Sequence, residues 1–415
     1  MPIVPPSSSH PPIDWLIVAI FAVVYLGMFL GGLPKLKLDR SGVALLGAIA
    51  IVGVGALDTE QAARAVDLPT LLLLFSFMVV SAQMRLGGFY TAVTRRVAAL
   101  PLSPDGLLGA LLTVAAALSA VFSNDIVCLA MTPVVARICL QRGLPPLPYL
   151  VGLACAANIG SAATLIGNPQ NMLIGSLMQL SFADYARTAL PPVALSLAAL
   201  WLWLAWLRQR LPPVPIAPGT PQADDPPFDG WQTAKGLSVA SALLAIFLFS
   251  DWPREVAALA AAGVLLLSRR FHSSHVMGFV DWELLILFIG LFVVNHAFAT
   301  TGLAAQAIAW LAAQGVHLAD SGPLFAATLG LSNLVSNVPA VMLLIPHISG
   351  PEAGATLALV STFAGNLLLV GSIANLIVVD LARKSGIEID WRAHARIGMP
   401  ITLATTGIVW VWVTQ

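Results

Sequence analysis

A polar stretch, A-N-I-G-S-A-A-T-L-I-G-N-P-Q-N at residues 157–171, interrupts apolar sequence and is the segment of this chain best equipped for chemistry. It combines amide and hydroxyl side chains with Gly160, Gly167 and Pro169, which weaken or break a helix. At membrane depth, such a segment is tolerated only where it is buried in protein or lines a cavity. Broken helices whose half-helix ends point at a solute are typical of secondary transporters. The stretch is therefore predicted to form one wall of an ion or small-solute site.

Asp125 is the acidic residue that lies deepest in an apolar run, after Ser123-Asn124 and before the apolar segment Ile126–Leu140. An ionisable residue inside a membrane segment is energetically expensive and usually functional. We therefore expect Asp125 to bind a cation or to carry a proton. The alternative is a structural carboxylate that caps the half-helix at Ile126–Leu140 through its free backbone amides. The two roles are compatible.

The composition indicates an all-α polytopic membrane protein. Of 415 residues, 58% are hydrophobic and 10% are charged, whereas a soluble domain has about 25% charged residues. The formal net charge is zero, which argues against a nucleic-acid partner. The first apolar run, at about Ile13–Gly32, is long and follows no basic residue, so it is expected to span the membrane rather than to be a cleaved signal peptide. The three cysteines have no metal-ligand spacing and are interpreted as small buried hydrophobic residues.

The two halves of the chain resemble one another in the order of their motifs, which indicates an internal repeat. Three matches occur in the same order in both halves. The matched pairs are Asp67 with Asp281, Ser123-Asn124 with Ser336-Asn337, and G-N-P-Q-N at 167–171 with G-S-I-A-N at 371–375.

This repeat predicts the domain organisation. A first repeat at residues 1–210 is joined by a cytoplasmic linker at 211–235, rich in Pro and Asp, to a second repeat at 236–415. Each repeat is predicted to hold a re-entrant helical hairpin and a broken transmembrane helix. The hairpins are expected at about 106–140 and 323–348, and the broken helices at about 148–180 and 353–382.

The distribution of Lys and Arg predicts the topology. If the hairpins do not cross the membrane, each repeat has five crossings, and an odd number places the two repeats in opposite orientations. With the basic loop after the first helix in the cytoplasm, the positive-inside rule is satisfied and both termini are predicted to be periplasmic. The basic residues left outside are Arg64, Arg187 and Arg254.

We predict that both hairpin tips and both broken helices share one site in the inner membrane. The alternative for any single amide is a helix cap or a hydrogen bond between packed helices. No cofactor is expected, and the only metal considered is a coupling Na⁺ at Ser123, Asn124, Asp125 and Gly167. The candidate site residues are Ser123, Asn124, Asp125, Asn158, Thr164, Gly167, Asn168, Asn171, Ser336, Asn337, Asn366, Gly371, Ser372 and Asn375.

The sequence places no Lys or Arg at the predicted midplane. An anionic solute would therefore be held by amides, hydroxyls and helix ends, together with a coupling Na⁺ or H⁺. A neutral hydroxylated solute would suit the same lining. The expected partners are a small inorganic or organic anion, or neutral arsenite, and the lipid bilayer. The sequence leaves open whether the assembly is a monomer or a homodimer.

The motifs resemble those of the ion transporter superfamily, which includes arsenite permeases, sodium/proton antiporters and the dicarboxylate, citrate and sulfate carriers. Residues 157–171 are similar to the family stretch N-I-G-G-T-A-T-L-I-G-D-P-P-N, and S-N-L-V-S-N-V-P-A at 332–340 is similar to the paired hairpin tip. Here Asn168 stands in place of an Asp, Gln170 in place of a Pro and Ser161 in place of a Gly, which fits a branch described as anion permeases. The resemblance implies an inverted-repeat secondary carrier that moves its solute by an elevator-like displacement.

Three transport functions remain open from the sequence. The first is secondary transport of a small anion or oxyanion, coupled to H⁺ or Na⁺. The second is efflux of arsenite or antimonite, and the third is Na⁺/H⁺ antiport with Asp125 as the carrier carboxylate. An enzyme is not expected, because a single deep Asp125 supplies neither a nucleophile–base pair nor two catalytic aspartates.

Overall fold

The computed structural model describes residues 11–33, 36–216 and 227–414, and these residues form helices and connecting segments without a strand. This confirms the all-α class. Seven described helices are long and apolar enough to cross a membrane. They are α1 (Pro11–Leu30), α4 (Leu68–Leu86), α7 (Asn124–Arg142), α10 (Phe182–Gln209), α11 (Gly230–Phe249), α14 (Trp282–Thr300) and α20 (Trp391–Val413).

Shorter helices complete both halves of the chain. In the first half these are α2 (Arg40–Gly53), α3 (Thr59–Ala65), α5 (Phe89–Ala98), α6 (Pro104–Ser119), α8 (Pro146–Ser161) and α9 (Pro169–Leu177). In the second half they are α12 (Arg254–Leu266), α13 (Ser273–Met277), α15 (Leu303–Ala313), α16 (Ser321–Val335), α17 (Asn337–Leu344), η1 (Ile345–His347), α18 (Pro351–Ala364), η2 (Leu369–Gly371) and α19 (Ile373–Lys384).

Aspartates start several of these helices, and two of them occupy matched positions of the two halves. The Asp67 carboxylate accepts a hydrogen bond from the Thr70 amide at the start of α4, at 2.8 Å. The Asp281 carboxylate accepts one from the Leu284 amide at the start of α14, at 2.9 Å. Each side chain satisfies an amide that the helix itself leaves without a partner. The matched aspartates therefore share a capping role.

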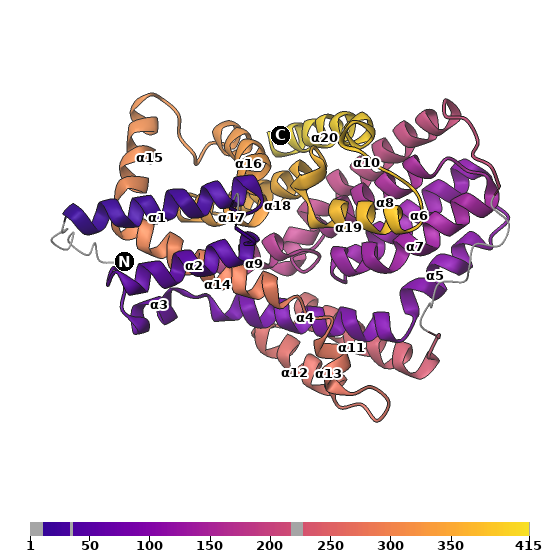
Figure 1. Ribbon diagram of the computed structural model, residues 1–415, viewed down its shortest axis with the longest axis horizontal. Coiled ribbons are helices and arrows are strands. Elements are labelled where there is room, and N and C mark those ends of the chain that lie inside the picture. Colours follow the sequence, from indigo (N-terminus) through magenta and orange to yellow (C-terminus); the bar gives the residue numbers. More distant parts are fainter. Residues whose placement is uncertain (1–10, 34–35, 217–226, 415) are drawn as a thin grey trace.

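Helices from the two halves are interleaved (Figure 1). The indigo helices α1 and α2 pack on the orange helix α14, while α4 packs on α11 and α12. On the other side, α7 and α8 contact the yellow helix α19, and α10 contacts α20. The packing is reciprocal, because α2 with α14 is matched by α12 with α4. Helices of both halves thus pack against one another on both sides of the molecule.

The first helix break is narrower than the sequence suggests, and the second is longer and begins earlier. Helix α8 continues through Asn158 to Ser161, so the first break covers only residues 162–168. The second break begins earlier than expected, at Gly365, and includes the short helix η2. Asn158 remains helical because its side chain is bonded to other side chains and does not compete for the backbone.

Two other expectations need adjustment. The predicted linker at 211–235 lies partly outside the described residues, and α11 already begins at Gly230. Four short helices, α3, α5, α13 and α15, lie in segments for which the sequence suggested no helix. Their brevity explains this, because a helix of 5–11 residues has little periodic signal.

Candidate functional site

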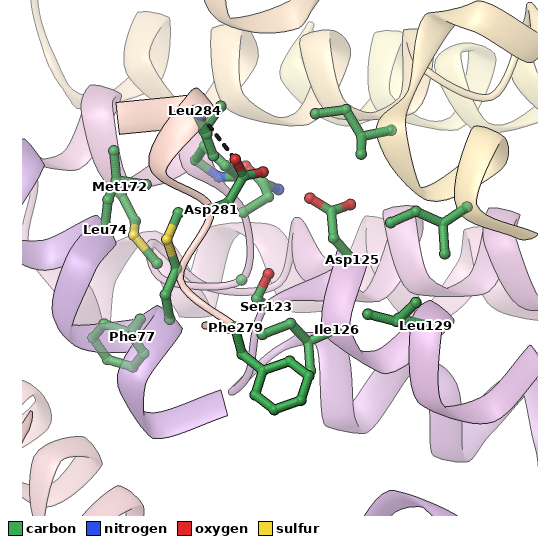
Figure 2. A pocket seen from close by; sticks show the side chains of 16 residues that line it. Leu74, Phe77, Ser123, Asp125, Ile126, Leu129, Met172, Phe279, Asp281 and Leu284 are labelled. Atoms are coloured by element: carbon green, nitrogen blue, oxygen red, sulfur yellow. Dashed lines mark hydrogen bonds between the residues drawn. The ribbon is translucent and has the colours of Figure 1, made fainter. Parts of the chain in front are cut away.

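A cavity of about 140 Å³ lies where the start of α7, the first helix break and the start of α14 meet. Its polar lining consists of Ser123, Asp125, Asn168 and Asp281, and Gly167 supplies backbone. Figure 2 shows Asp125 and Asp281 extending toward one another into this space, near Ser123. The cavity therefore brings two carboxylates from different halves of the chain together.

A chain of amides behind this cavity joins the two halves. Asn124 donates from Nδ2 to Asn158 Oδ1 at 3.1 Å, and Asn158 donates from Nδ2 to Asn366 Oδ1 at 2.9 Å. The hydroxyl of Ser372 also donates to Asn158 Oδ1, at 3.0 Å. Asn124, Asn158 and Asn366 are buried. Asn158 is therefore the centre of a link between the first hairpin tip and the second helix break.

Asn168 organises the first break. Its Oδ1 accepts from the Asn171 amide at 2.9 Å and so caps α9. Its Nδ2 donates to Ser161 Oγ at 2.9 Å and to Thr362 Oγ1 at 3.3 Å. Gln170 donates to the same Thr362 hydroxyl at 3.2 Å. Thr362, which lies on α18, therefore binds both Asn168 and Gln170.

Asn171 and Asn375 each donate to the backbone of their own helix break. Asn171 Nδ2 donates to the Thr164 carbonyl at 3.0 Å and to Tyr185 Oη at 3.0 Å. Asn375 Nδ2 donates to the Gly365 and Leu368 carbonyls at 2.9 and 3.1 Å. Asn375 thus bonds two carbonyls of its break, whereas Asn171 bonds one carbonyl and a tyrosine hydroxyl.

Gly167 is required by close packing. A Cβ at this position would lie 2.2 Å from the Ser161 carbonyl oxygen and 2.7 Å from that of Ser119. The Gly167 carbonyl in turn accepts from the Asn124 amide at 3.4 Å, which ties the break to the first hairpin tip. Gly371, its counterpart, has more room, because the nearest atom to its Cβ position is the Gly365 oxygen at 3.1 Å.

The second hairpin tip is strained and borders a second cavity. Ser336 has φ 77°, a left-handed backbone that is costly for a residue with a side chain. It lines this cavity with Arg40, Asp281 and Ile373. The sequence alone did not indicate that an arginine would lie beside this tip. Asp281 and Ile373 line both cavities.

Several polar atoms around the two tips have no hydrogen-bond partner among the described residues. They comprise three amide oxygens, which can accept from a solute or bind a cation, and one amide nitrogen, which can donate. They are Asn124 Oδ1, Asn337 Oδ1, Asn375 Oδ1 and Asn366 Nδ2. Because a buried amide without a partner is costly, this set is suited to a polar ligand. No cluster of His, Cys, Asp and Glu with metal-site geometry occurs in the described ranges.

The structure thus brings most of the predicted residues into one polar region. Ser123, Asp125, Gly167 and Asn168 line the first cavity, Ser336 lines the second, and Asn124, Asn158 and Asn366 form the amide chain. Thr164 has a more structural place, because its hydroxyl donates to the Ala120 carbonyl at 2.5 Å.

Besides Arg40, sequence reasoning missed three residues of this region. Asp281 was recognised only as a repeat-matched residue before a span, although that match to Asp67 pointed to it. Thr362 and Tyr185 lie in apolar helices and are buried, and a lone hydroxyl in such a helix gives no distinguishing signal.

Comparisons with known proteins agree with this architecture. The family model described as citrate transporter (CitMHS) matches residues 16–364. The silicon efflux transporter LSI3 of Oryza sativa subsp. japonica is 27% identical over 94% of this chain and 95% of its own length. The inner membrane protein YbiR of Escherichia coli (strain K12) is 28% identical over 83% of this chain and 88% of its own. The structure of the Alcanivorax borkumensis YdaH transporter has a TM-score of 0.61 at 16% identity, with 98% of each chain covered, which shows a shared fold.

Proposed function

The chain belongs to the citrate transporter (CitMHS) family of membrane transporters, and we propose that it is a secondary active transporter that moves a small anion or oxyanion across the inner membrane, coupled to H⁺ or Na⁺. The observation that carries this proposal is the cavity that places Asp125 and Asp281 beside the buried amide network. The amides and hydroxyls suit the oxygen atoms of a solute, and the carboxylates suit a cation or protons.

The two carboxylates support coupling to a cation. Two negative charges at close range in a partly desolvated cavity repel each other and also repel an anionic solute. A proton or Na⁺ at Asp125 and Asp281 would remove this repulsion, so that the anion and the cation would bind together. If the solute is an anion, the two carboxylates therefore require a coupling cation for the anion to bind.

We propose that transport uses an elevator-like movement of the hairpins and broken helices against the remaining helices. Support comes from the reciprocal packing of α2 on α14 and α12 on α4, as expected of inverted repeats. The proposed moving parts are the hairpins at about 106–140 and 323–348 and the broken helices at about 148–180 and 353–382. The periplasmic location of both termini belongs to the same proposal.

Flux measurements in proteoliposomes test the proposed function. A thermal-shift screen against carboxylates, oxyanions, arsenite and Na⁺ first identifies a stabilising solute, because a ligand raises stability with the logarithm of its concentration over Kd. Solute uptake is then measured with and without pH and Na⁺ gradients. We expect Asp125→Asn to lose the dependence on the gradient, while Asp184→Asn, an exposed carboxylate on α10, behaves as the parent. Unchanged ion dependence in Asp125→Asn would exclude the coupling role.

A second candidate is efflux of a neutral hydroxylated solute such as arsenite. The same two carboxylates favour it, because a neutral molecule escapes their repulsion, and silicon efflux is the function named for the rice relative. Cys128 and Cys155 are fully buried, so direct thiol ligation is not expected. Arsenite resistance of cells that express the Cys128→Ala/Cys155→Ala variant should equal that of the parent. Ion exchange in liposomes without any solute would instead indicate Na⁺/H⁺ antiport.

A further inference from the structure

Two hydrogen bonds tie the first broken helix to the neighbouring packed helices. Asp67, which caps α4, accepts from the Ser176 hydroxyl on α9 at 3.2 Å. The guanidinium of Arg254, the first residue of α12, donates to the Gly175 carbonyl on α9 at 3.1 Å. Ser176 is buried and Arg254 is half-buried. We call Asp67, Arg254, Gly175 and Ser176 the closed gate.

The repeat supplies a second pair of the same two residue types. The shift along the sequence that superimposes Asp67 on Asp281 also superimposes Arg40 on Arg254. Arg40 is the first residue of α2, as Arg254 is of α12, and Asp281 caps α14, as Asp67 caps α4. Both the residue types and their places at the helix starts therefore recur.

The second pair is not engaged in the same way. Arg40 and Asp281 line the cavity at the second hairpin tip, and Asp281 is exposed to solvent. Among the described residues, Arg40 Nε is buried and has no hydrogen-bond partner. We call Arg40 and Asp281 the open gate.

The two gates lie at opposite ends of the packed helices. Helix α2 starts at Arg40, and the chain turns after its far end into α4, which starts at Asp67. In the same way, α12 starts at Arg254 and the chain returns after its far end to Asp281. A helix of 14 residues, such as α2, is about 21 Å long at 1.5 Å per residue. The gates are thus separated by most of the thickness of a membrane core.

The cavities fit this assignment. The Asp125 cavity ends at Leu74 on α4 and Met172 on α9. A separate cavity on the Arg254 side ends at the next turn of α9 and the next residue of α4, Ser176 and Leu73. The linings of the two cavities are therefore adjacent along α4 and α9, and Ser176 and Arg254 of the closed gate line the second of them.

We propose that Asp67 and Arg254 hold the transporter closed at one face, that Arg40 and Asp281 are the repeat-related gate now open at the other face, and that the two gates alternate during transport. This inference rests on the proposed elevator movement. The partner for Arg40 in the other state is expected on α19. The shift that superimposes Asn171 on Asn375 places Asp380 at the position of Ser176, and Asp380 now pairs with Lys384 at 2.8 Å on the surface.

Sided labelling of a single cysteine tests the alternation without any solute. Ile373→Cys is the reporter, because Ile373 lines both cavities beside the open gate and is 41% exposed. A membrane-impermeant maleimide is applied to oriented vesicles from each face in turn. The same variants without the reporter give the background from the three native cysteines, which are buried.

Opposite effects are expected from the two arginines. Arg254→Ala and the milder Arg254→Gln should change the ratio of labelling from the two faces about tenfold toward the Arg254 face, which corresponds to about 1.4 kcal/mol. Arg40→Ala should change the ratio in the other direction. Arg64→Ala, at an exposed arginine of α3, is the matched control and should leave the ratio unchanged. Folding of each variant is checked by a single symmetrical peak in size-exclusion chromatography.

Two results would contradict the proposed gates. One is an equal ratio of labelling from the two faces in all folded variants, and the other is a change of this ratio in the same direction for Arg254→Ala and Arg40→Ala. Solute flux is measured in the same vesicles, so the two proposals fail separately. Opposite changes in labelling without flux of any tested solute would leave the gates standing and remove the proposed solute class. Flux of a solute without opposite changes in labelling would leave the proposed function standing and remove the two gates.

Discussion

The two helix breaks of this chain occupy matched positions in the two halves of the sequence, yet they are held very differently. In the first break, Asn168 makes three hydrogen bonds and Gly167 has no space for a side chain. In the second break, Ser372 makes one side-chain bond, and its helix start lacks a side-chain cap. Unpartnered amide atoms concentrate around the second break, at Asn337, Asn366 and Asn375.

This difference separates two tasks within one site. A break whose polar groups are all satisfied is rigid and fixes the position of the Asp125 cavity. A break with unsatisfied amides retains capacity to bind a solute or an ion. We therefore expect substitutions in the first break to reduce stability and substitutions in the second to alter solute affinity.

The largest effect is expected at the paired glycines. Gly167→Ala must displace the Ser161 and Ser119 carbonyls and should cost about 3 kcal/mol. Gly371→Ala meets one oxygen at 3.1 Å and should cost about 1 kcal/mol or less. Thermal unfolding of the purified proteins in detergent measures both. Gly263→Ala, where a Cβ meets nothing within 4 Å, is the control. Equal losses at Gly167 and Gly371 would contradict the comparison.

The next largest difference in stability is expected between substitutions of Asn168 and Ser372, the residues that precede α9 and α19. Asn168→Ala removes the cap of α9 and leaves Ser161 and Thr362 without this partner, so it should cost about 2–3 kcal/mol. Ser372→Ala should cost about 1 kcal/mol, because one hydrogen bond is lost. The same unfolding assay applies. A larger loss for Ser372→Ala would show that the second break is the rigid one.

Tyr185→Phe gives a smaller effect confined to the first break. Its hydroxyl accepts from Asn171 and donates to the Ala162 carbonyl at 2.7 Å, and the repeat offers no such tyrosine to the second break, where Ile389 stands. Its removal should lower stability by about 1 kcal/mol. Tyr149→Phe, which also removes a buried-ring hydroxyl bonded to one carbonyl but far from the site, is the control for solute affinity. Solute affinity that falls in Tyr185→Phe but not in Tyr149→Phe would contradict a role of the first break in stability alone.

The smallest effect on stability is expected at the second hairpin tip. Asn337→Ala removes an amide whose oxygen has no partner among the described residues, so stability should change by less than about 0.5 kcal/mol. Solute affinity should nevertheless fall, by about tenfold for one lost hydrogen bond to a charged group. Titration of the thermal shift with the solute measures both quantities. Wild-type affinity in this variant would remove Asn337 from the site.

The sequence predicts those features of this molecule that depend on strong local residue patterns. Pro169, Gly167 and the amides around them break a helix, and Asp125 stands out because a carboxylate in an apolar run is rare. The sequence cannot predict what depends on contacts between distant helices. Thr362 binds Asn168 through packing of α18 on α9, and no local pattern encodes that contact. Asn158 was placed in a break because amides disfavour helices, but its bonds to Asn124 and Asn366 keep it helical.

Asp281 borders both cavities, and this has a thermodynamic consequence. A cation bound beside Asp281 in the Asp125 cavity neutralises a negative charge that also acts on a ligand in the second cavity, which Ser336 lines. Binding in one cavity therefore changes the affinity of the other, and linkage requires the change to be equal in both directions. A single shared carboxylate thus makes occupancy of the two cavities interdependent, even if their ligands never touch.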